Sequence, residues 1–132
     1  VAIAVALAHP SRWRAGGFVA LAGVVSGING LVKWIVGRHR PVPEVGIHPF
    51  DFRPFDGGLH GLFAAKNLCF PSGHACLAFA TAAAVGLVLP KWRYCLYALA
   101  VLVGVERVLE NAHYVSDVFG AAVLGILVAH LT

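Results

Sequence analysis

Long stretches without charged residues constrain the fold of this chain more than any other feature. Residues 15–32, 75–89, 94–105 and 118–132 contain no Asp, Glu, Lys or Arg. Only 12% of the 132 residues are charged, and the mean hydropathy is +0.80. Soluble globular domains carry about 25% charged residues. The sequence therefore predicts helices that are surrounded by lipid.

These stretches predict an all-α protein, a polytopic bundle of transmembrane helices in one domain over residues 1–132. The first helix is expected to continue to about residue 36, and Pro90 should end the second. Each run is shorter than the roughly 20 residues of a full span, so the helices are expected to extend into their charged flanks. Residues 1–8 predict the end of a truncated helix in front of four full spanning helices.

The connections between the predicted helices indicate an orientation. Basic residues precede the first full span (Arg12, Arg14) and join the second to the third (Lys91, Arg93). The positive-inside rule places both turns in the cytoplasm. Residues 37–70, rich in proline and longer than a passive connection needs, would then form an extracytoplasmic active-site loop. The expected location is the plasma or inner membrane, with the site facing outward.

Charge and cysteine content exclude several classes of protein. The formal net charge is +4, but no arginine-rich tract or zinc-finger spacing indicates nucleic acid as a partner. The three cysteines, Cys69, Cys76 and Cys95, have no CxxC spacing and do not predict a metal site or a disulfide framework.

Two clusters of polar residues flank the predicted active-site loop. Lys33 and Arg40 are seven residues apart, which predicts that both lie on one face of a helix. The alternative is that their side chains extend from a helix end toward the membrane surface, without a ligand. Ser72 and Gly73 precede an apolar helix, so Ser72 is expected to cap that helix. The free N–H groups at the start of the helix are expected to bind an anion. His74 can exchange a proton near neutral pH. The alternative for this second cluster is an ordinary capped helix with an interfacial histidine.

A third cluster precedes the last apolar run. His113 and Asp117 are four residues apart and would be stacked on a helix. A carboxylate at one imidazole nitrogen would leave the other nitrogen free to attack. Arg107 can bind phosphate with two hydrogen bonds. The alternative is a buried, salt-bridged histidine. Taken together, the mostly positive clusters predict an anionic ligand, and phosphate suits them best.

The three clusters form an ordered set of motifs: Lys33-x6-Arg40-Pro41, then Pro71-Ser72-Gly73-His74, then Arg107-x5-His113-x3-Asp117. The set resembles the signature of the type 2 phosphatidic acid phosphatase family, in the superfamily shared with vanadium haloperoxidases. One position departs from the family pattern, because Glu106 stands where the family has a serine. Glu106 could hold Arg107 by an ion pair or repel a phosphate.

The resemblance implies a metal-independent phosphatase without cofactors, acting on a lipid phosphate or polyprenyl pyrophosphate through a phosphohistidine. It implies that His113 is the nucleophile, that Asp117 orients it and that His74 is the general acid. The implied phosphate-binding residues are Lys33, Arg40, Ser72, Gly73 and Arg107. Membrane members of the family look like bundles of six spanning helices, of which this chain would be the core.

Other functions remain open at this point. A haloperoxidase would hold vanadate in the same site, a head-group binder or transporter subunit would hold phosphate without turnover, and a purely structural membrane module would bind neither. Polyprenyl pyrophosphate, phosphatidate, phosphatidylglycerol phosphate and a lipid A phosphate all fit as substrates, together with the bilayer itself as a partner.

Overall fold

The computed structural model describes residues 12–40, 52–55, 58–63 and 68–131. Their regular secondary structure is helical, with two isolated β-bridges and no β-strand in these ranges. The elements are α2 (Arg12–Val36), α3 (Gly58–Phe63), α4 (Gly73–Val88), the 3-10 turn η2 (Pro90–Trp92), α5 (Arg93–Leu109) and α6 (Val115–Leu131). The all-α prediction is confirmed. The predicted truncated helix over residues 1–8 lies outside the described residues.

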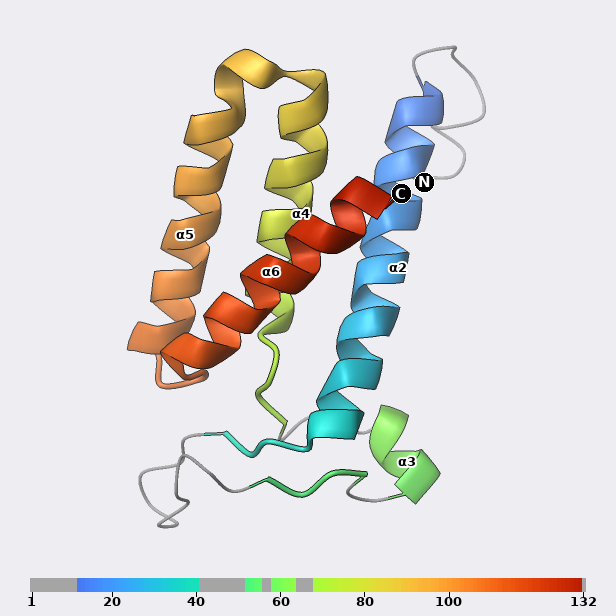
Figure 1. The fold of residues 1–132 in the computed structure, drawn as a ribbon, viewed down its shortest axis with the longest axis vertical. Coiled ribbons are helices and arrows are strands. Elements are labelled where there is room, and N and C mark those ends of the chain that lie inside the picture. Colours follow the sequence, from blue (N-terminus) through green and yellow to red (C-terminus); the bar gives the residue numbers. More distant parts are fainter. Residues whose placement is uncertain (1–11, 41–51, 56–57, 64–67, 132) are drawn as a thin grey trace.

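Helix α4 is the centre of the bundle. It contacts α2, α5 and α6, and η2 joins it to α5 in an antiparallel hairpin (Figure 1). Helix α6 crosses α4 obliquely, and α2 runs along the other side (Figure 1). The start of α2 lies at the same end of the bundle as η2. The opposite end, lowest in Figure 1, holds the ends of α2 and α5 and the starts of α4 and α6.

Small side chains let the helices approach each other closely. The buried core includes Ala75, Cys76, Ala80, Ala83, Ala121 and Ala129, with Leu21, Val25, Phe79 and Val128 around them. At the crossing of α4 and α6, a Cβ added to Gly125 would collide with the Cys76 carbonyl oxygen. Gly23 and Gly27, on the glycine stripe of α2, have no other described residue within 4 Å of an added Cβ. The close contact is therefore made by α6 and not by that stripe.

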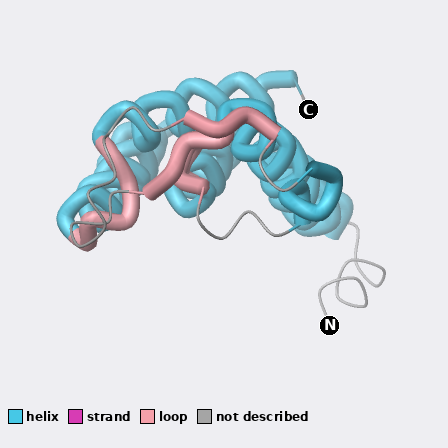
Figure 2. Tube along the Cα trace, turned by 90° about the horizontal axis from the view of Figure 1, so that it is seen from below, coloured by secondary structure: helices cyan, strands magenta, loops and turns pink. Residues whose placement is uncertain are grey.

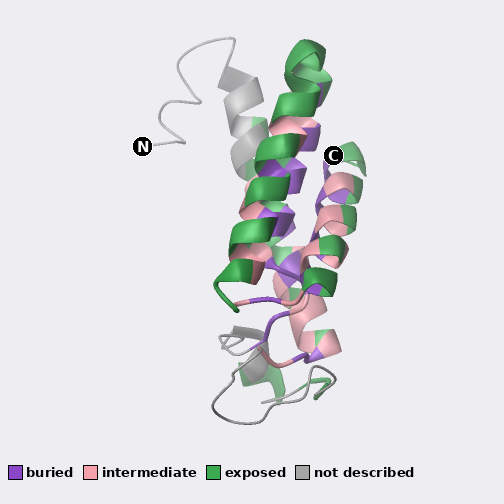
Figure 3. Ribbon diagram, turned by 90° about the vertical axis from the view of Figure 1, so that its left-hand side faces the viewer, coloured by how far each residue is buried: buried purple, intermediate pink, exposed green. Residues whose placement is uncertain are grey.

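Much of the apolar surface faces outward. Helix α5 buries only Ala100 and Gly104, so most of it is exposed (Figure 3). Leu102 on α5 is 62% exposed and Phe119 on α6 is 72% exposed.

Three of the described helices are shorter than a full membrane span. Helices α4, α5 and α6 have 16 or 17 residues. At about 1.5 Å per residue each is about 25 Å long, less than the roughly 30 Å of the hydrocarbon layer. Within the described ranges, no helix combines the length and the apolar character that a membrane crossing requires. Helices α2, α5 and α6 do extend into their charged flanks, as predicted.

The segments that follow α2 and precede α4 lie across the lower end of the bundle (Figure 2). Gly37 ends α2 with φ +62°, and its N–H donates to the Lys33 carbonyl at 2.8 Å. This is the left-handed C-terminal cap that glycine favours. After Gly37, Arg38 forms an isolated antiparallel β-bridge with Phe52, and His39 forms one with Leu68.

Candidate active site

The predicted site residues come from four helix ends at the lower end of the bundle (Figure 1). Lys33 is in the last turn of α2, and Ser72 directly precedes α4. Arg107 is in the last turn of α5, and Asp117 is in the first turn of α6. Because α4 is central, its start lies among the other three ends. The topology therefore gathers at one end the three motifs that are far apart in the sequence.

Lys33 and Arg40 do not share a helix face, contrary to the prediction. Helix α2 ends at Val36, and the left-handed Gly37 turns the chain before Arg40 is reached. Burial first, and repulsion from Arg40 second, lower the pKa of Lys33. The Lys33 ammonium donates to the Leu68 carbonyl at 2.8 Å. The buried Nε of Arg40 has no hydrogen-bond partner in the described part of the chain.

The start of α4 offers free donors. Ser72 occupies the N-cap position, as predicted, but its hydroxyl makes no capping bond. The residue is fully buried, and its Oγ has no partner among the described residues. The first intrahelical bond runs from the Cys76 N–H to the Ser72 carbonyl at 2.9 Å. The N–H groups of Gly73 and His74 precede that bond and have no helical acceptor. The Ser72 N–H itself donates to the Asp117 carbonyl at 3.2 Å, which ties α4 to α6.

His74 is exposed and lies on the side of α4 that faces α2. It lines a cleft of about 240 Å³ together with Val25, Ser26, Asn29, Gly73 and Leu77. His113 is not among the residues that line this cleft. The two predicted proton-transfer residues, His74 and His113, therefore do not share this cleft.

His113 lies in the loop between α5 and α6, so the predicted helical stacking on Asp117 is wrong. Its N–H donates to the Arg107 carbonyl at 3.2 Å, and the residue is 5% exposed. Its Nδ1 is 3.7 Å from Asp117 Oδ2, beyond hydrogen-bond distance. His113 and Asp117 are close together because α6 starts two residues after His113, and its first turn places Asp117 near the imidazole. The carboxylate thus faces Nδ1 and leaves Nε2 on the other side of the ring.

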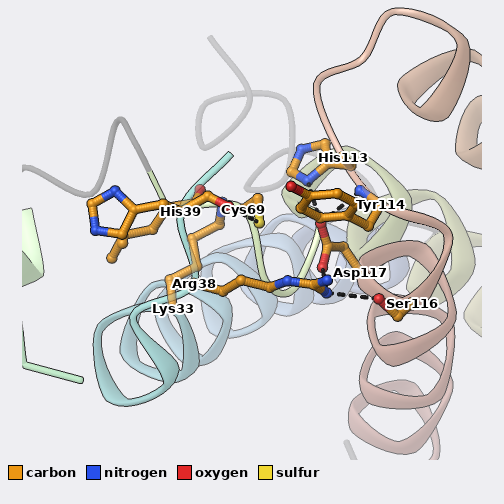
Figure 4. Close-up of polar contacts among 9 residues, drawn as sticks. Lys33, Arg38, His39, Cys69, His113, Tyr114, Ser116 and Asp117 are labelled. Carbon is orange, nitrogen blue, oxygen red and sulfur yellow. Dashed lines mark hydrogen bonds and ion pairs between the residues drawn. The ribbon is translucent and has the colours of Figure 1, made fainter. Parts of the chain in front are cut away.

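Asp117 is fully buried and is held by two donors. Arg38 Nη1 lies 2.6 Å from Oδ1, and the Tyr114 N–H donates to Oδ2 at 2.8 Å (Figure 4). Burial alone would raise the pKa of Asp117, but His113, the Tyr114 N–H, Cys69 and Arg38 together hold that pKa below its usual value. Asp117 is therefore an anion at neutral pH.

Arg38 is the residue that sequence reasoning missed. Its guanidinium is buried, and the same Nη1 also donates to Ser116 Oγ at 2.6 Å. Its Cζ lies 4.2 Å from the centroid of the Tyr114 ring. The available signal was Gly37, because a helix-ending glycine frees the next residue from the helix and lets it turn inward.

Arg107 is held by both neighbouring acids. Its Nη2 lies 2.8 Å from Glu110 Oε2 and 3.4 Å from Glu106 Oε2. The ion-pair alternative for Glu106 is thus confirmed, with Glu110 as the closer partner. Both carboxylates are more than half exposed, so solvent screens these pairs. The buried Nε of Arg107 has no partner among the described residues.

Unpartnered polar atoms are concentrated on the predicted site residues. Within the described ranges they include Arg40 Nε, Ser72 Oγ, Arg107 Nε and His113 Nδ1. Buried polar atoms are rarely left without a partner unless a ligand or water completes them. Three of these four atoms belong to N–H or O–H groups that can donate. An anion with several acceptor oxygens would satisfy them.

Comparison with known proteins identifies relatives over nearly the whole chain. A family model described as the PAP2 superfamily matches residues 13–132. A lipid A 1-phosphatase of Rhizobium johnstonii is 36% identical over 118 residues, which are 89% of this chain and 46% of that protein. A lipid A 1-phosphatase of Rhizobium etli is 36% identical over 111 residues, 83% of this chain and 45% of that protein. No solved structure matches. The chain thus spans about half the length of these curated relatives.

Proposed function

Because the chain belongs to the PAP2 superfamily, we propose that it is a metal-independent lipid phosphatase that works through a phosphohistidine on His113. The observation that carries the proposal is the group of buried atoms on Arg40, Ser72 and Arg107 that have no partner among the described residues. The resemblance of the motifs implies a phosphate site at the same residues. A folded chain tolerates such atoms where a ligand completes their hydrogen bonds.

In the first step, the Nε2 lone pair of His113 attacks phosphorus and forms a P–N bond. The P–O bond to the lipid breaks, and His74 gives its proton to the leaving oxygen. Asp117, anionic and facing Nδ1, stabilises the positive charge that the imidazole gains. The separation of 3.7 Å between His113 Nδ1 and Asp117 Oδ2 must shorten for a hydrogen bond, as catalytic contacts often do when substrate binds.

In the second step, water attacks the phosphohistidine. His74, now neutral, takes a proton from that water, the P–N bond breaks, and inorganic phosphate leaves. His113 and His74 are returned to their starting protonation states. The same pair of histidines therefore serves both steps.

The phosphoryl group needs positioning and charge neutralisation more than covalent chemistry. Lys33, Arg40 and Arg107 supply positive charge, and the Arg Nε–H groups supply directed donors. The Ser72 hydroxyl and the Gly73 N–H add neutral donors at the positive end of the α4 dipole. These fixed groups neutralise the equatorial oxygens in place of a metal ion.

Among the possible substrates, we favour the 1-phosphate of a lipid A. Both Rhizobium relatives are named lipid A 1-phosphatase, at 36% identity over most of this chain. The other candidates are polyprenyl pyrophosphate, phosphatidate and phosphatidylglycerol phosphate. They belong in the same assay.

We place the enzyme at the plasma or inner membrane, with its site on the extracytoplasmic side. The exposed apolar residues of α5 and α6, such as Leu102 and Phe119, support contact with lipid. The basic turn with Lys91 and Arg93 lies at the end of the bundle opposite α6's start (Figure 1). By the positive-inside rule that turn faces the cytoplasm, which directs His113 outward.

The decisive experiment is phosphate release from a panel of the four lipid classes by the purified protein in detergent with EDTA. His113→Ala is run beside it, and His130→Ala is the matched control, because His130 is exposed in the last turn of α6. Release that survives EDTA, persists in His130→Ala and disappears in His113→Ala is expected. A ³²P label on the enzyme that is stable to alkali and lost in acid would identify the phosphohistidine.

The opposite outcome is equally clear. If the wild-type protein binds phosphate or vanadate but releases nothing from any lipid, it is a binding protein, and the pairing of Glu106 with Arg107 gives a reason. Glu106→Ser, which restores the residue type of the family, would then be the next variant to assay. Release that EDTA abolishes would refute the metal-independent mechanism.

A further inference from the structure

The backbone around Arg38 is fixed on both sides. Gly37 terminates α2, Arg38 forms a bridge with Phe52, and the Cys69 N–H donates to the Arg38 carbonyl at 2.8 Å. Arg38 therefore does not swing freely at a helix end. Its side chain is directed into the bundle toward the start of α6 (Figure 4).

The guanidinium contacts the residues that directly follow His113. Nη1 donates to Ser116 Oγ and pairs with Asp117 Oδ1, each at 2.6 Å. The same group lies over the Tyr114 ring, with 4.2 Å between Cζ and the ring centroid. One buried cation thus holds three of the four residues after His113. A change at Arg38 would be felt directly by the loop that carries the nucleophile.

The two oxygens of Asp117 have different partners. Oδ1 is bound by Arg38, whereas Oδ2 accepts the Tyr114 N–H at 2.8 Å and lies 3.7 Å from His113 Nδ1. A carboxylate gripped at both oxygens cannot rotate about its last bond. Oδ2 is therefore the oxygen that faces His113 Nδ1, and Nε2 is the nitrogen on the far side of the ring.

We propose that Arg38 is a positioning residue for phosphoryl transfer, which orients the Asp117 carboxylate toward His113 Nδ1 and binds no phosphate itself. The inference rests on the proposed function. Arg38 differs in this from Arg40 and Arg107, whose buried Nε atoms have no partner in the part of the chain that the structure describes. Its Nη1 is engaged by Asp117 and Ser116, in a site already neutralised by a carboxylate.

The test compares wild type, Arg38→Gln and Arg38→Lys on the lipid phosphate that the wild type hydrolyses best, as purified protein in detergent. Arg93→Gln is the matched control, because Arg93 is exposed at the opposite end of the bundle. Rates are expressed per folded enzyme, from the amplitude of thermal unfolding. The measured quantities are kcat, KM, their pH dependence and the single-turnover rate of phosphoenzyme formation.

We expect Arg38→Gln to lower kcat and the phosphoenzyme rate by about tenfold to a hundredfold, the scale of a small misplacement of a reacting group. KM should stay within about twofold, since the phosphate ligands are untouched. The acidic limb of the pH profile should move to higher pH, because an Asp117 without its cation protonates more easily. Arg38→Lys should recover part of the rate, since it keeps the charge but not the planar fork.

Three results would overturn the inference. An unchanged kcat in Arg38→Gln would show that Asp117 is positioned without it. A raised KM with unchanged kcat would make Arg38 a phosphate ligand. A loss of kcat with an unmoved pH profile and no recovery in Arg38→Lys would reduce Arg38 to a folding role. If Arg38→Gln does not fold, Arg38→Lys is judged by kcat, KM and pH profile alone. A wild-type protein without turnover fails the proposed function instead, before any Arg38 variant is compared.

Discussion

The crossing of α4 and α6 makes a quantitative prediction for Gly125. A Cβ at this position would collide with the Cys76 carbonyl oxygen and lie 3.0 Å from the Ala80 nitrogen. Both atoms belong to the backbone of α4, so no side chain can rotate away to make room. Overpacking of this kind costs about 1–3 kcal/mol. Replacing Gly by Ala inside a helix returns about 0.5–1 kcal/mol of backbone entropy. Because both clashing atoms are backbone, the cost should fall in the upper half of that range, about 2–3 kcal/mol, so Gly125→Ala should destabilise the protein by about 1–2.5 kcal/mol.

Gly23→Ala is the matched control in α2. No other described residue lies within 4 Å of a Cβ at this position, so only the entropy gain of about 0.5–1 kcal/mol remains. A chain of this size changes its Tm by about 4 °C per kcal/mol. Gly125→Ala should lower the Tm by about 4–10 °C, and Gly23→Ala should raise it by about 2–4 °C.

The assay is thermal unfolding of the purified protein in one detergent, followed by intrinsic tryptophan fluorescence. The two variants differ from wild type by one methyl group each, so the signs of their shifts are the result. If Gly125→Ala is as stable as wild type, α4 and α6 do not cross at Gly125 as described. If Gly23→Ala is destabilised instead, the glycine stripe of α2 packs against another part of the protein.

Further predictions concern polar groups at the site. Ser72→Ala should change the Tm by less than about 2 °C, because the hydroxyl makes no capping bond, yet should raise KM for the lipid phosphate if Ser72 binds it. Folding lowers the pKa of Asp117, so its ionised form stabilises the native state at pH values above the unfolded pKa of about 4. This stabilisation is lost as the pH falls below that value. The Tm difference between wild type and Asp117→Asn should therefore shrink below about pH 4. Burial, with Asp117 nearby, raises the pKa of Cys69 to about 12. An alkylating reagent at pH 8 should therefore label the exposed Cys95 in the folded protein, and Cys69 only after unfolding. Mass spectrometry of peptides measures the labelling of each cysteine.

The helices could be predicted from the sequence because apolar runs, Pro90 and charged flanks are local signals. The predicted run over residues 75–89 corresponds to α4 (Gly73–Val88), and the run over 118–132 corresponds to α6 (Val115–Leu131). Helix contacts were harder to predict, because they depend on rotation about the helix axis. Three glycines in α2 predicted a packing face, whereas the close backbone contact between α4 and α6 is made by Gly125.

The motifs predicted which residues gather, but not how they are held. Spacings of seven and four residues were interpreted as helical, yet Arg40 and His113 both lie in loops. A spacing fixes geometry only while the backbone stays regular, and Gly37 and the end of α5 at Leu109 both interrupt it. The proximity of the motifs survives because it is set by topology, since four helix ends meet at one end of the bundle whatever the local conformation of the loops.

Arg38 illustrates a more general limit. In the sequence, three basic or imidazole side chains follow Gly37 in succession, and nothing in their types separates a phosphate ligand from a residue that binds a carboxylate. The structure separates them by their partners, because Arg38 pairs with Asp117 while the buried Nε of Arg40 has no partner among the described residues. A cation that neutralises a buried carboxylate contributes little net charge to an anion site, whereas an unpartnered one contributes fully. The different roles of these two arginines therefore follow from which of them faces Asp117. Substitution of Arg38 should lower kcat, whereas substitution of Arg40 should raise KM.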